Sequence, residues 1–203
     1  MVRGRGPELT CGDVVLRLHR RGDARAWQEV RDANDAWLKP WEGTSPEGPK
    51  PPGSFSSMLR HLNTEYDEGR MYPFAVVYQG NYVGQLTIGN VIRGSLQGAY
   101  IGYWIDARVA GRGIMPTALA MALDFALSTA GLHRIEVSIR PENAASLRVV
   151  EKLHMELEGT RKRYLHIAGD WRDHLIFVAD KENSPGEGYL HRWLRERKQM
   201  FGA

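Results

Sequence analysis

The chain has 203 residues, of which 42% are hydrophobic and 25% charged, and its formal net charge at pH 7 is +3. These values are typical of a globular protein with one substantial domain, and so weak a charge selects neither an anionic ligand nor a ribonucleoprotein partner. The single cysteine, Cys11, excludes an internal disulfide. No apolar stretch is long enough for a signal core or a membrane span, so a cytoplasmic protein is expected.

The first third of the chain predicts a strand followed by two helices. Val14–Leu18 alternates like a strand, a helix can start near Gly22, and Phe55–Tyr66 has helical spacing of its apolar residues. Between the helices, residues 37–53 carry two tryptophans and are rich in proline and glycine. This composition predicts a surface loop, and one wall of a substrate groove is the alternative interpretation.

An antiparallel hairpin is predicted next. Phe74–Tyr78 and Tyr82–Ile88 are strand-like runs that flank the turn residues Gln79–Asn81. The aromatic and β-branched run Ala99–Asp106 then predicts a further strand.

That strand ends in a glycine-rich turn, Arg108–Ile114, and a helical pattern continues from there to about Ala130. Such a turn aims unpaired backbone N–H groups and the positive end of the helix dipole at one point, where a phosphate fits. Arg108 and Arg112 add positive charge. A plain tight turn is the alternative at this stage. The P-loop and dinucleotide-binding patterns are excluded, because the turn lacks the lysine of the first and the third glycine of the second.

The last third predicts a strand over Arg134–Arg140, a short helix capped by Asn143, and a closing hairpin from Tyr164–Ile167 and Trp171–Val178. The tail from Lys181 is basic and looks separate from the domain.

The expected organisation is an N-terminal arm over residues 1–12, one α+β domain with a mixed sheet over 13–180, and a basic tail over 181–203. Tyr189–Met200 could form a helix in that tail.

Several motifs in this order resemble the GCN5-related N-acetyltransferases (GNAT). Their signature, Arg/Gln-x-x-Gly-x-Gly/Ala at a strand-to-helix turn, is matched by Arg108–Gly113. Segments similar to the RimJ-type ribosomal-protein-alanine N-acetyltransferases of that superfamily are Leu38–Glu42, Asn90–Ser95, Ile101–Tyr103, Arg140–Ser146, Tyr164–Leu165 and Trp171–His174. The resemblance runs from roughly Val14 to Val178. It implies an α+β GNAT fold, with a mixed, mostly antiparallel sheet that is splayed at the acetyl-CoA site and flanked by helices.

The resemblance also implies acetyl-CoA as the co-substrate. The backbone of the turn would hold its pyrophosphate, and the pantetheine arm would lie where Ile101–Ile105 and Ile135–Ile139 separate. Asn143 would hydrogen-bond that arm and Ser146 would face the sulfur, whereas a helix cap and a solvent-facing hydroxyl are the alternatives. The expected cofactor-binding residues are Ile105, Arg108, Val109, Ala110, Gly111, Arg112, Gly113, Ile114, Asn143 and Ser146.

Acetyl transfer needs a neutral amine, a hydrogen bond to the thioester carbonyl and a proton for the leaving thiolate. An N-terminal amine has an ordinary pKa of about 8 and lysine one of about 10.4, so a weak base suffices for an N-terminal acceptor. The catalytic candidates are Ser146 as the donor to the thiolate, Glu136 as the base and Tyr103 for either proton. A surface salt bridge is the alternative role for Glu136.

The acceptor groove is expected between the 37–53 loop and the closing hairpin. Its expected substrate-binding residues are Trp41, Tyr164, Trp171 and Asp173. Asp173 and His174 are neighbours on a strand and point to opposite faces, so they cannot form a dyad, and one of them is expected to line the groove.

Two departures from the pattern of the resembled family involve three residues: Thr117 stands where relatives commonly carry a glutamate, and His154-Met155 stand where they usually carry Gly-Phe. The predicted function is direct transfer of acetyl from acetyl-CoA to an amine, above all the N-terminal α-amine of a ribosomal protein. A small amine (polyamine, amino acid or aminoglycoside) as the acceptor and a non-catalytic acyl-CoA- or RNA-associated module are the alternatives. No metal, membrane or direct nucleic-acid contact is expected, and a homodimer is left open.

Overall fold

The computed structural model describes residues 6–48 and 53–201. Residues 1–5 of the predicted arm, 49–52 of the predicted loop and 202–203 of the predicted tail lie outside the described residues. The strands are β1 (Glu8–Cys11), β2 (Val14–Leu18), β3 (Tyr72–Tyr78), β4 (Asn81–Ile92), β5 (Gly98–Ile105), β6 (Arg134–Ile139), β7 (Glu156–Ile167) and β8 (Asp170–Asp180). The helices are α1 (Ala24–Ala33), α2 (Asp35–Leu38), α3 (Phe55–Asp67), α4 (Ile114–Asp124), α5 (Ala144–Glu151) and α6 (Tyr189–Phe201).

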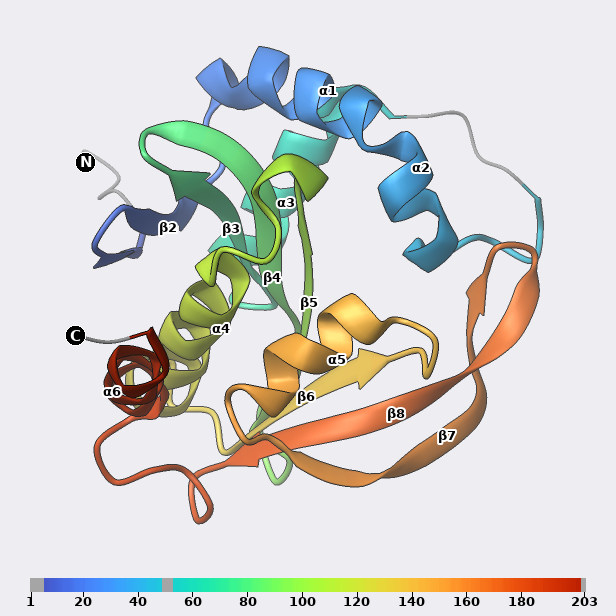
Figure 1. Cartoon of the computed structure of the whole chain (residues 1–203). Coiled ribbons are helices and arrows are strands. Elements are labelled where there is room, and N and C mark those ends of the chain that lie inside the picture. The colour runs from blue at the N-terminus through green and yellow to red at the C-terminus, as the bar shows by residue number, and fades with distance from the viewer. Residues whose placement is uncertain (1–5, 49–52, 202–203) are drawn as a thin grey trace.

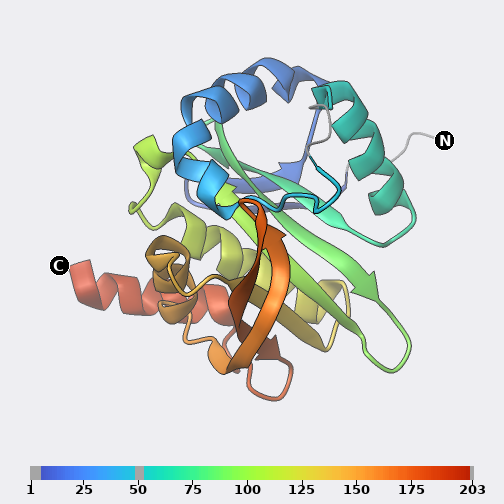
Figure 2. The same ribbon diagram turned by 90° about the vertical axis from the view of Figure 1, so that its right-hand side faces the viewer.

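All the strands join one sheet in the order β1-β2-β3-β4-β5-β6-β8-β7, with helices on both faces (Figures 1 and 2). Side chains alternate across β3: Phe74 and Val76 enter the main core with α4, whereas Ala75 packs on the other face against Val30 of α1 and Tyr82 of β4. Helices α4, α5 and α6 therefore form one layer, and α1 and α3 form the other.

The sheet is splayed between β5 and β6. These two strands form the parallel pair of the described sheet, and their register runs only from Gly98 opposite Arg134 to Tyr100 opposite Glu136. Beyond that point β5 stays paired with β4, and β6 with β8. The expected mixed, mostly antiparallel and splayed sheet is thereby confirmed, because the two strands diverge toward the end of β5 that precedes the glycine turn.

The predicted elements of the domain are confirmed, with differences at four places. Residues 8–11 of the predicted arm form β1, which pairs with β2. The segment predicted as a loop from residue 37 begins in helical structure, as α2 and a 3-10 turn over Lys39–Trp41. Strand β7 starts at Glu156, before the predicted hairpin. The predicted tail helix exists as α6, but it is not separate, because its Trp193 is only 2% exposed within the main core.

One buried histidine lies away from the splayed region. His19 is 6% exposed, and neither ring nitrogen has a hydrogen-bond partner among the described residues. Its ring centroid lies 6.5 Å from that of Phe55 and 5.8 Å from that of Tyr82. Burial of the imidazole lowers the pKa of His19 from 6.5 to about 4.

Acid should therefore destabilise the fold before the carboxylates titrate. Between about pH 6.5 and 4 the unfolded chain binds a proton at His19 and the folded chain does not, so the free energy of unfolding falls by up to about 3 kcal/mol as the pH drops. We expect His19→Leu to reduce the dependence of Tm on pH over this window. The remaining dependence comes from the other buried histidine, His174, whose pKa burial also lowers. His61→Leu, on the exposed side of α3, is the control, and an unchanged slope in His19→Leu would contradict the assignment.

Candidate functional site

A buried polar network holds the glycine turn from beneath. Asn34 and Asp106 are 2% and 3% exposed. The Asn34 Nδ2 group donates to Asp106 Oδ1 at 3.1 Å, and Asn34 Oδ1 accepts the Ala107 N–H at 2.8 Å. Burial is the largest single influence and opposes ionisation of Asp106. The hydrogen bonds from the Arg108 guanidinium, the Arg108 N–H and Asn34, with the charge of Arg108, together outweigh it and lower the pKa of Asp106. Sequence reasoning missed this pair, because nothing in their spacing of 72 residues signals the contact.

The turn itself has the conformation that its glycines permit. Gly111 and Gly113 have φ angles of 80° and 83°, in the left-handed region that other residues rarely adopt, and Gly113 is the N-cap of α4. No described residue accepts a hydrogen bond from the N–H groups of residues 111–114. These donors are therefore available to a ligand at the positive end of the α4 dipole.

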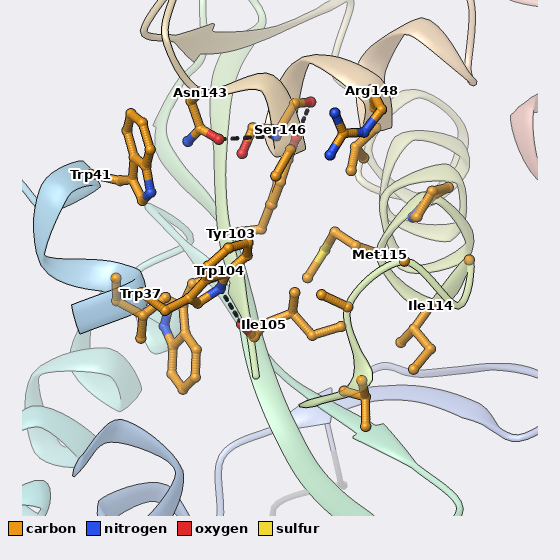
Figure 3. A pocket seen from close by; sticks show the side chains of 18 of the residues that line it. Trp37, Trp41, Tyr103, Trp104, Ile105, Ile114, Met115, Asn143, Ser146 and Arg148 are labelled. Carbon is orange, nitrogen blue, oxygen red and sulfur yellow. Dashed lines mark hydrogen bonds between the residues drawn. The ribbon is translucent and has the colours of Figure 1, made fainter. Parts of the chain in front are cut away.

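A cavity opens in front of this turn and is called the turn cavity here (Figure 3). Its walls are the turn, the first residues of α4, the end of β5, α5, and the α2 segment. The lining residues are Trp37, Leu38, Trp41, Glu42, Tyr103, Trp104, Ile105, Val109, Ala110, Gly111, Gly113, Ile114, Met115, Pro116, Asn143, Ala145, Ser146, Arg148, Val149 and Lys152.

Ser146 is held in this cavity through its main chain. Its N–H donates to Asn143 Oδ1 at 3.0 Å, and its carbonyl accepts from the Tyr103 hydroxyl at 3.2 Å (Figure 3). The Ser146 hydroxyl and the Asn143 Nδ2 group make no hydrogen bond to any described residue, so both remain available. Burial raises the pKa of Tyr103, so the phenol stays protonated at neutral pH and can donate a hydrogen bond but cannot serve as a general base.

A second cavity lies where β5 and β6 separate and is called the splay cavity here. It is lined by Trp41, Ile101, Gly102, Tyr103, Val137, Ser138, Ile139, Arg140, Asn143, Ser146, Ile167 and His174. Four of these residues also line the turn cavity: Trp41, Tyr103, Asn143 and Ser146. Two ligands that enter from the two cavities would therefore meet at Ser146 and Tyr103.

His174 is the imidazole of the splay cavity and is 2% exposed. Its Nδ1 lies 3.0 Å from the Arg172 carbonyl. Because a carbonyl only accepts, Nδ1 carries the proton and Nε2 is left with a lone pair. Burial lowers the pKa of His174, so this neutral form prevails at neutral pH. Of the neighbours Asp173 and His174, the histidine lines the splay cavity, whereas Asp173, the residue selected from the sequence, does not.

Three of the charged residues singled out from the sequence lie outside both cavities. The Arg108 side chain is bound to Asp106, and the Arg112 guanidinium donates to the Arg108 carbonyl at 3.1 Å. Glu136 lies on β6 in ion pairs with Arg134 at 3.0 Å and Arg161 at 2.9 Å. The cations that do line the turn cavity are Arg148 and Lys152, which sequence reasoning did not select.

Of the four predicted acceptor-site residues, only Trp41 lines the cavities. Tyr164 packs its ring against that of His174, at 5.8 Å between centroids, and so lies behind the cavity wall. Trp171 packs against His166 at 5.5 Å, and Asp173 pairs with Lys162 at 2.8 Å on the exposed side of the hairpin.

The two predicted walls of the acceptor groove are joined to each other. Thr44 N–H donates to the His166 carbonyl at 2.8 Å, and Gly43 pairs with Ile167 as a β-bridge. Arg140 donates to the Pro40 carbonyl at 3.0 Å and lies 5.4 Å from the centre of the Trp41 ring. Residues 40–44, which follow α2, and residues 166–167 at the tip of the β7–β8 hairpin thus form a continuous arch over the splay cavity.

The residues of the turn cavity fit coenzyme A. Unpaired main-chain N–H groups and two cations suit its phosphates, and the free Nδ2 group of Asn143 suits an amide of the pantetheine arm. A second cavity with a neutral imidazole meets this site at a hydroxyl. Fold and site together define an acyl-CoA-dependent transferase.

Comparison with known proteins identifies the family. The model of the acetyltransferase (GNAT) domain matches residues 13–156, so the chain belongs to the GNAT family and is an acetyl-CoA-dependent N-acetyltransferase. It is 32% identical over 170 residues to the [ribosomal protein uS5]-alanine N-acetyltransferase of Escherichia coli K12, covering 83% of this chain and 88% of that protein. The structure of Mycobacterium smegmatis RimJ in complex with CoA-disulfide is similar at 41% identity and a TM-score of 0.85, covering 91% of this chain and 89% of that one. The ribosomal-protein-S5-alanine acetyltransferase of Vibrio fischeri has 26% identity and a TM-score of 0.77, covering 87% and 98%.

Two further observations concern the described ranges 6–48 and 53–201. None of their helices is long and apolar enough to cross a membrane. They bring no group of three or more histidine, cysteine, aspartate or glutamate side chains together as metal ligands. The expectations of no metal and no direct nucleic-acid contact, and the open question of a homodimer, stay as predictions.

A side chain at Gly111 should obstruct CoA. Gly111 lines the turn cavity at φ 80°, and Gly131 at the end of the α4 segment has φ 68°, with open space beside each Cα. Valine imposes similar backbone strain at both positions, so both variants should lose Tm. We expect Gly111→Val alone to weaken CoA binding, by about tenfold or more in calorimetry, because only there does the new side chain enter the cavity. Equal CoA affinities in the two variants would exclude the turn as the phosphate site.

Proposed function

We propose that the protein acetylates the N-terminal α-amine of a ribosomal protein, with alanine as the residue acetylated. The support comes from two relatives that cover most of the chain, one named a ribosomal protein uS5-alanine N-acetyltransferase and one named RimJ. The observation that carries the proposal is the junction of the turn cavity and the splay cavity at Ser146 and Tyr103. Such an acceptor would be met in the cytoplasm.

Acetyl-CoA supplies the thioester whose carbonyl carbon the amine attacks. We assign the turn N–H groups, Arg148 and Lys152 to the phosphates, and Asn143 Nδ2 to the pantetheine arm. The C–N bond forms as the C–S bond breaks. The Ser146 hydroxyl gives a proton to the leaving thiolate and takes the second proton that the attacking nitrogen loses as it becomes the amide, so the serine ends the step neutral. Tyr103 orients Ser146 and cannot act as a base, because its phenol stays protonated.

His174 takes the proton that the ammonium group must lose. Of the groups that line the splay cavity, only the tyrosine, the arginine and the imidazole can titrate, and only the imidazole holds a free lone pair at neutral pH. Glu136, the base expected from the sequence, lies outside both cavities, where two guanidinium groups bind its carboxylate. An α-amine with a pKa of about 8 needs only such a weak base, whereas lysine, at about 10.4, would remain largely charged.

The assignment of His174 as the base predicts that its replacement lowers kcat/KM by an amount that depends on pH. His174→Gln should lower kcat/KM for an alanine-starting peptide by about 100-fold at pH 7, and by much less at pH 9.5, where the amine has already lost its proton. CoA affinity and Tm are measured alongside. Asp173→Asn, on the opposite face of the same strand, is the matched control and should leave the profile unchanged. A defect in His174→Gln that is equal at both pH values would show that the imidazole is only structural.

Acceptor choice is tested by a panel of amines. Peptides that start with alanine or serine should exceed polyamines, free amino acids and aminoglycosides in kcat/KM, because the arch can contact the first peptide bonds, which a small amine lacks. Trp41→Ala should lower peptide acetylation by about tenfold or more, with a smaller effect on CoA binding, whereas Trp171→Ala, outside both cavities, should do neither. Melting curves separate loss of contact from unfolding. Faster turnover of any small amine than of every peptide would contradict the N-terminal acceptor.

A further inference from the structure

Helix α6 lies beyond the residues that the family model matches, yet it is part of the core. It packs along α4 on the side away from the sheet (Figure 1). Tyr189 and Trp193, one turn apart, are 3% and 2% exposed. At the far end of α4, Asp124 accepts the N–H groups of Tyr189 and Leu190 at 2.7 and 3.0 Å. This carboxylate caps α6 and fixes where the helix begins.

A chain of hydrogen bonds runs from α6 to the glycine turn. The Trp193 Nε1 group donates to Thr117 Oγ1 at 2.9 Å, and Thr117 Oγ1 donates to the Gly113 carbonyl at 2.9 Å. Thr117 and Trp193 are both buried, so neither polar group can exchange its partner for water. The conformation of Gly113 at the start of α4 is thereby tied to α6.

The same helix holds the other wall of the turn cavity. His154 Nε2 lies 2.9 Å from Glu196 Oε2, and the Arg192 guanidinium donates to the Leu153 carbonyl. Leu153 and His154 directly follow α5, the helix that carries Asn143 and Ser146. Helix α6 therefore contacts both elements between which the turn cavity opens.

Arg197 extends the contact to the phosphate side. Its guanidinium lies 3.3 Å from the position that a Cβ on Gly113 would occupy, and its Nη2 donates to the Arg112 carbonyl at 3.4 Å. Arg108 is bound to Asp106 and Arg112 to the Arg108 carbonyl, so Arg197 adds a further cation, which α6 holds against the turn beside Gly113.

We propose that α6 is a positioning element for acetyl-CoA: through Trp193–Thr117 and His154–Glu196 it fixes the separation of the glycine turn from α5, and Arg197 adds a positive charge beside the phosphates. This inference rests on the proposed cofactor site. Loss of the Trp193–Thr117 connection changes the affinity for CoA. It leaves Ser146 and Tyr103 at the junction of the two cavities in place, because Asn143 and Tyr103 hold Ser146 through its main chain.

The test compares variants that cut the hydrogen-bond chain with one that only loosens α6. Thr117→Val and Trp193→Phe keep most of the packed volume and should each weaken CoA binding by about tenfold in calorimetry. The double variant should be no weaker than the weaker single one, because both remove the same connection. Leu190→Ala, at the far end of α6, should lower Tm and leave CoA affinity within about twofold. At saturating acetyl-CoA, kcat should change by less than about twofold in all of them.

The contribution of the Arg197 charge is tested with Arg197→Gln, and Arg195→Gln is the control. Arg195 pairs with Glu187 away from the turn. Only Arg197→Gln should weaken CoA binding, by about threefold at low salt and less at high salt.

The outcomes separate the two proposals. If Thr117→Val and Trp193→Phe bind CoA as the parent does while Gly111→Val does not, the role of α6 is wrong and the cofactor site stands. If Gly111→Val also binds normally, the cofactor site itself is wrong. If Leu190→Ala loses as much CoA affinity as Trp193→Phe, stability rather than positioning explains the effect, and the inference is overturned.

Discussion

The parallel pairing of β5 and β6 ends after Tyr100 and Glu136, and the site depends on that ending. Past this point each strand keeps only its antiparallel partner, so the facing edges carry main-chain groups that the sheet does not use. A closed sheet would satisfy these groups and leave no gap. The splay cavity is lined by residues of both separated strands, the turn cavity by the end of β5, and the two cavities share four residues. One local failure of pairing thus makes room for the proposed meeting point of two substrates.

The glycine turn does not use its motif arginine to bind a ligand. Asp106 is buried, so its carboxylate needs a positively charged partner, and that partner is Arg108, the first residue of the motif. That arginine shapes the turn and is not free for phosphate. The groups left to attract an anion at the proposed site are main-chain N–H groups and cations from other elements: Arg148 on α5, Lys152 at the C-cap of α5, and Arg197 on α6.

Local patterns predicted most of the fold. The strand–turn–helix at residues 99–130, the hairpins and the Asn143 cap depend on short-range spacing, and each lies where expected. Roles that depend on distant partners were not predictable in this way. Glu136 looked like a base because it sits on a strand beside the splay, but Arg161, 25 residues later, binds it. Alternation showed that either Asp173 or His174 lines the groove, and only the packed hairpin decides which one.

One signal for α6 was present in the sequence. All of Ile114–Leu123 is apolar or small apart from Thr117, so α4 has no polar face. A helix that is apolar all round must be covered on every side, and the sheet covers only one. In the structure all ten of these residues are buried, and α6 provides the missing cover. The basic residues of the tail predict a solvated segment, but they lie on the exposed face of α6, whereas its apolar face covers α4.

The proposed cofactor site and the proposed acceptor site differ in the groups that they offer, main-chain groups in the first and side chains in the second. On the proposed cofactor side, the turn offers main-chain N–H groups, whose placement depends on backbone conformation rather than on side-chain identity. Even Ser146 is oriented through its own N–H and carbonyl. On the proposed acceptor side, Trp41, Arg140 and His174 contribute side chains, and the arch beside them joins two segments far apart in the sequence. Substitution of these side chains can therefore change the acceptor while the backbone of the turn still offers its N–H groups to CoA.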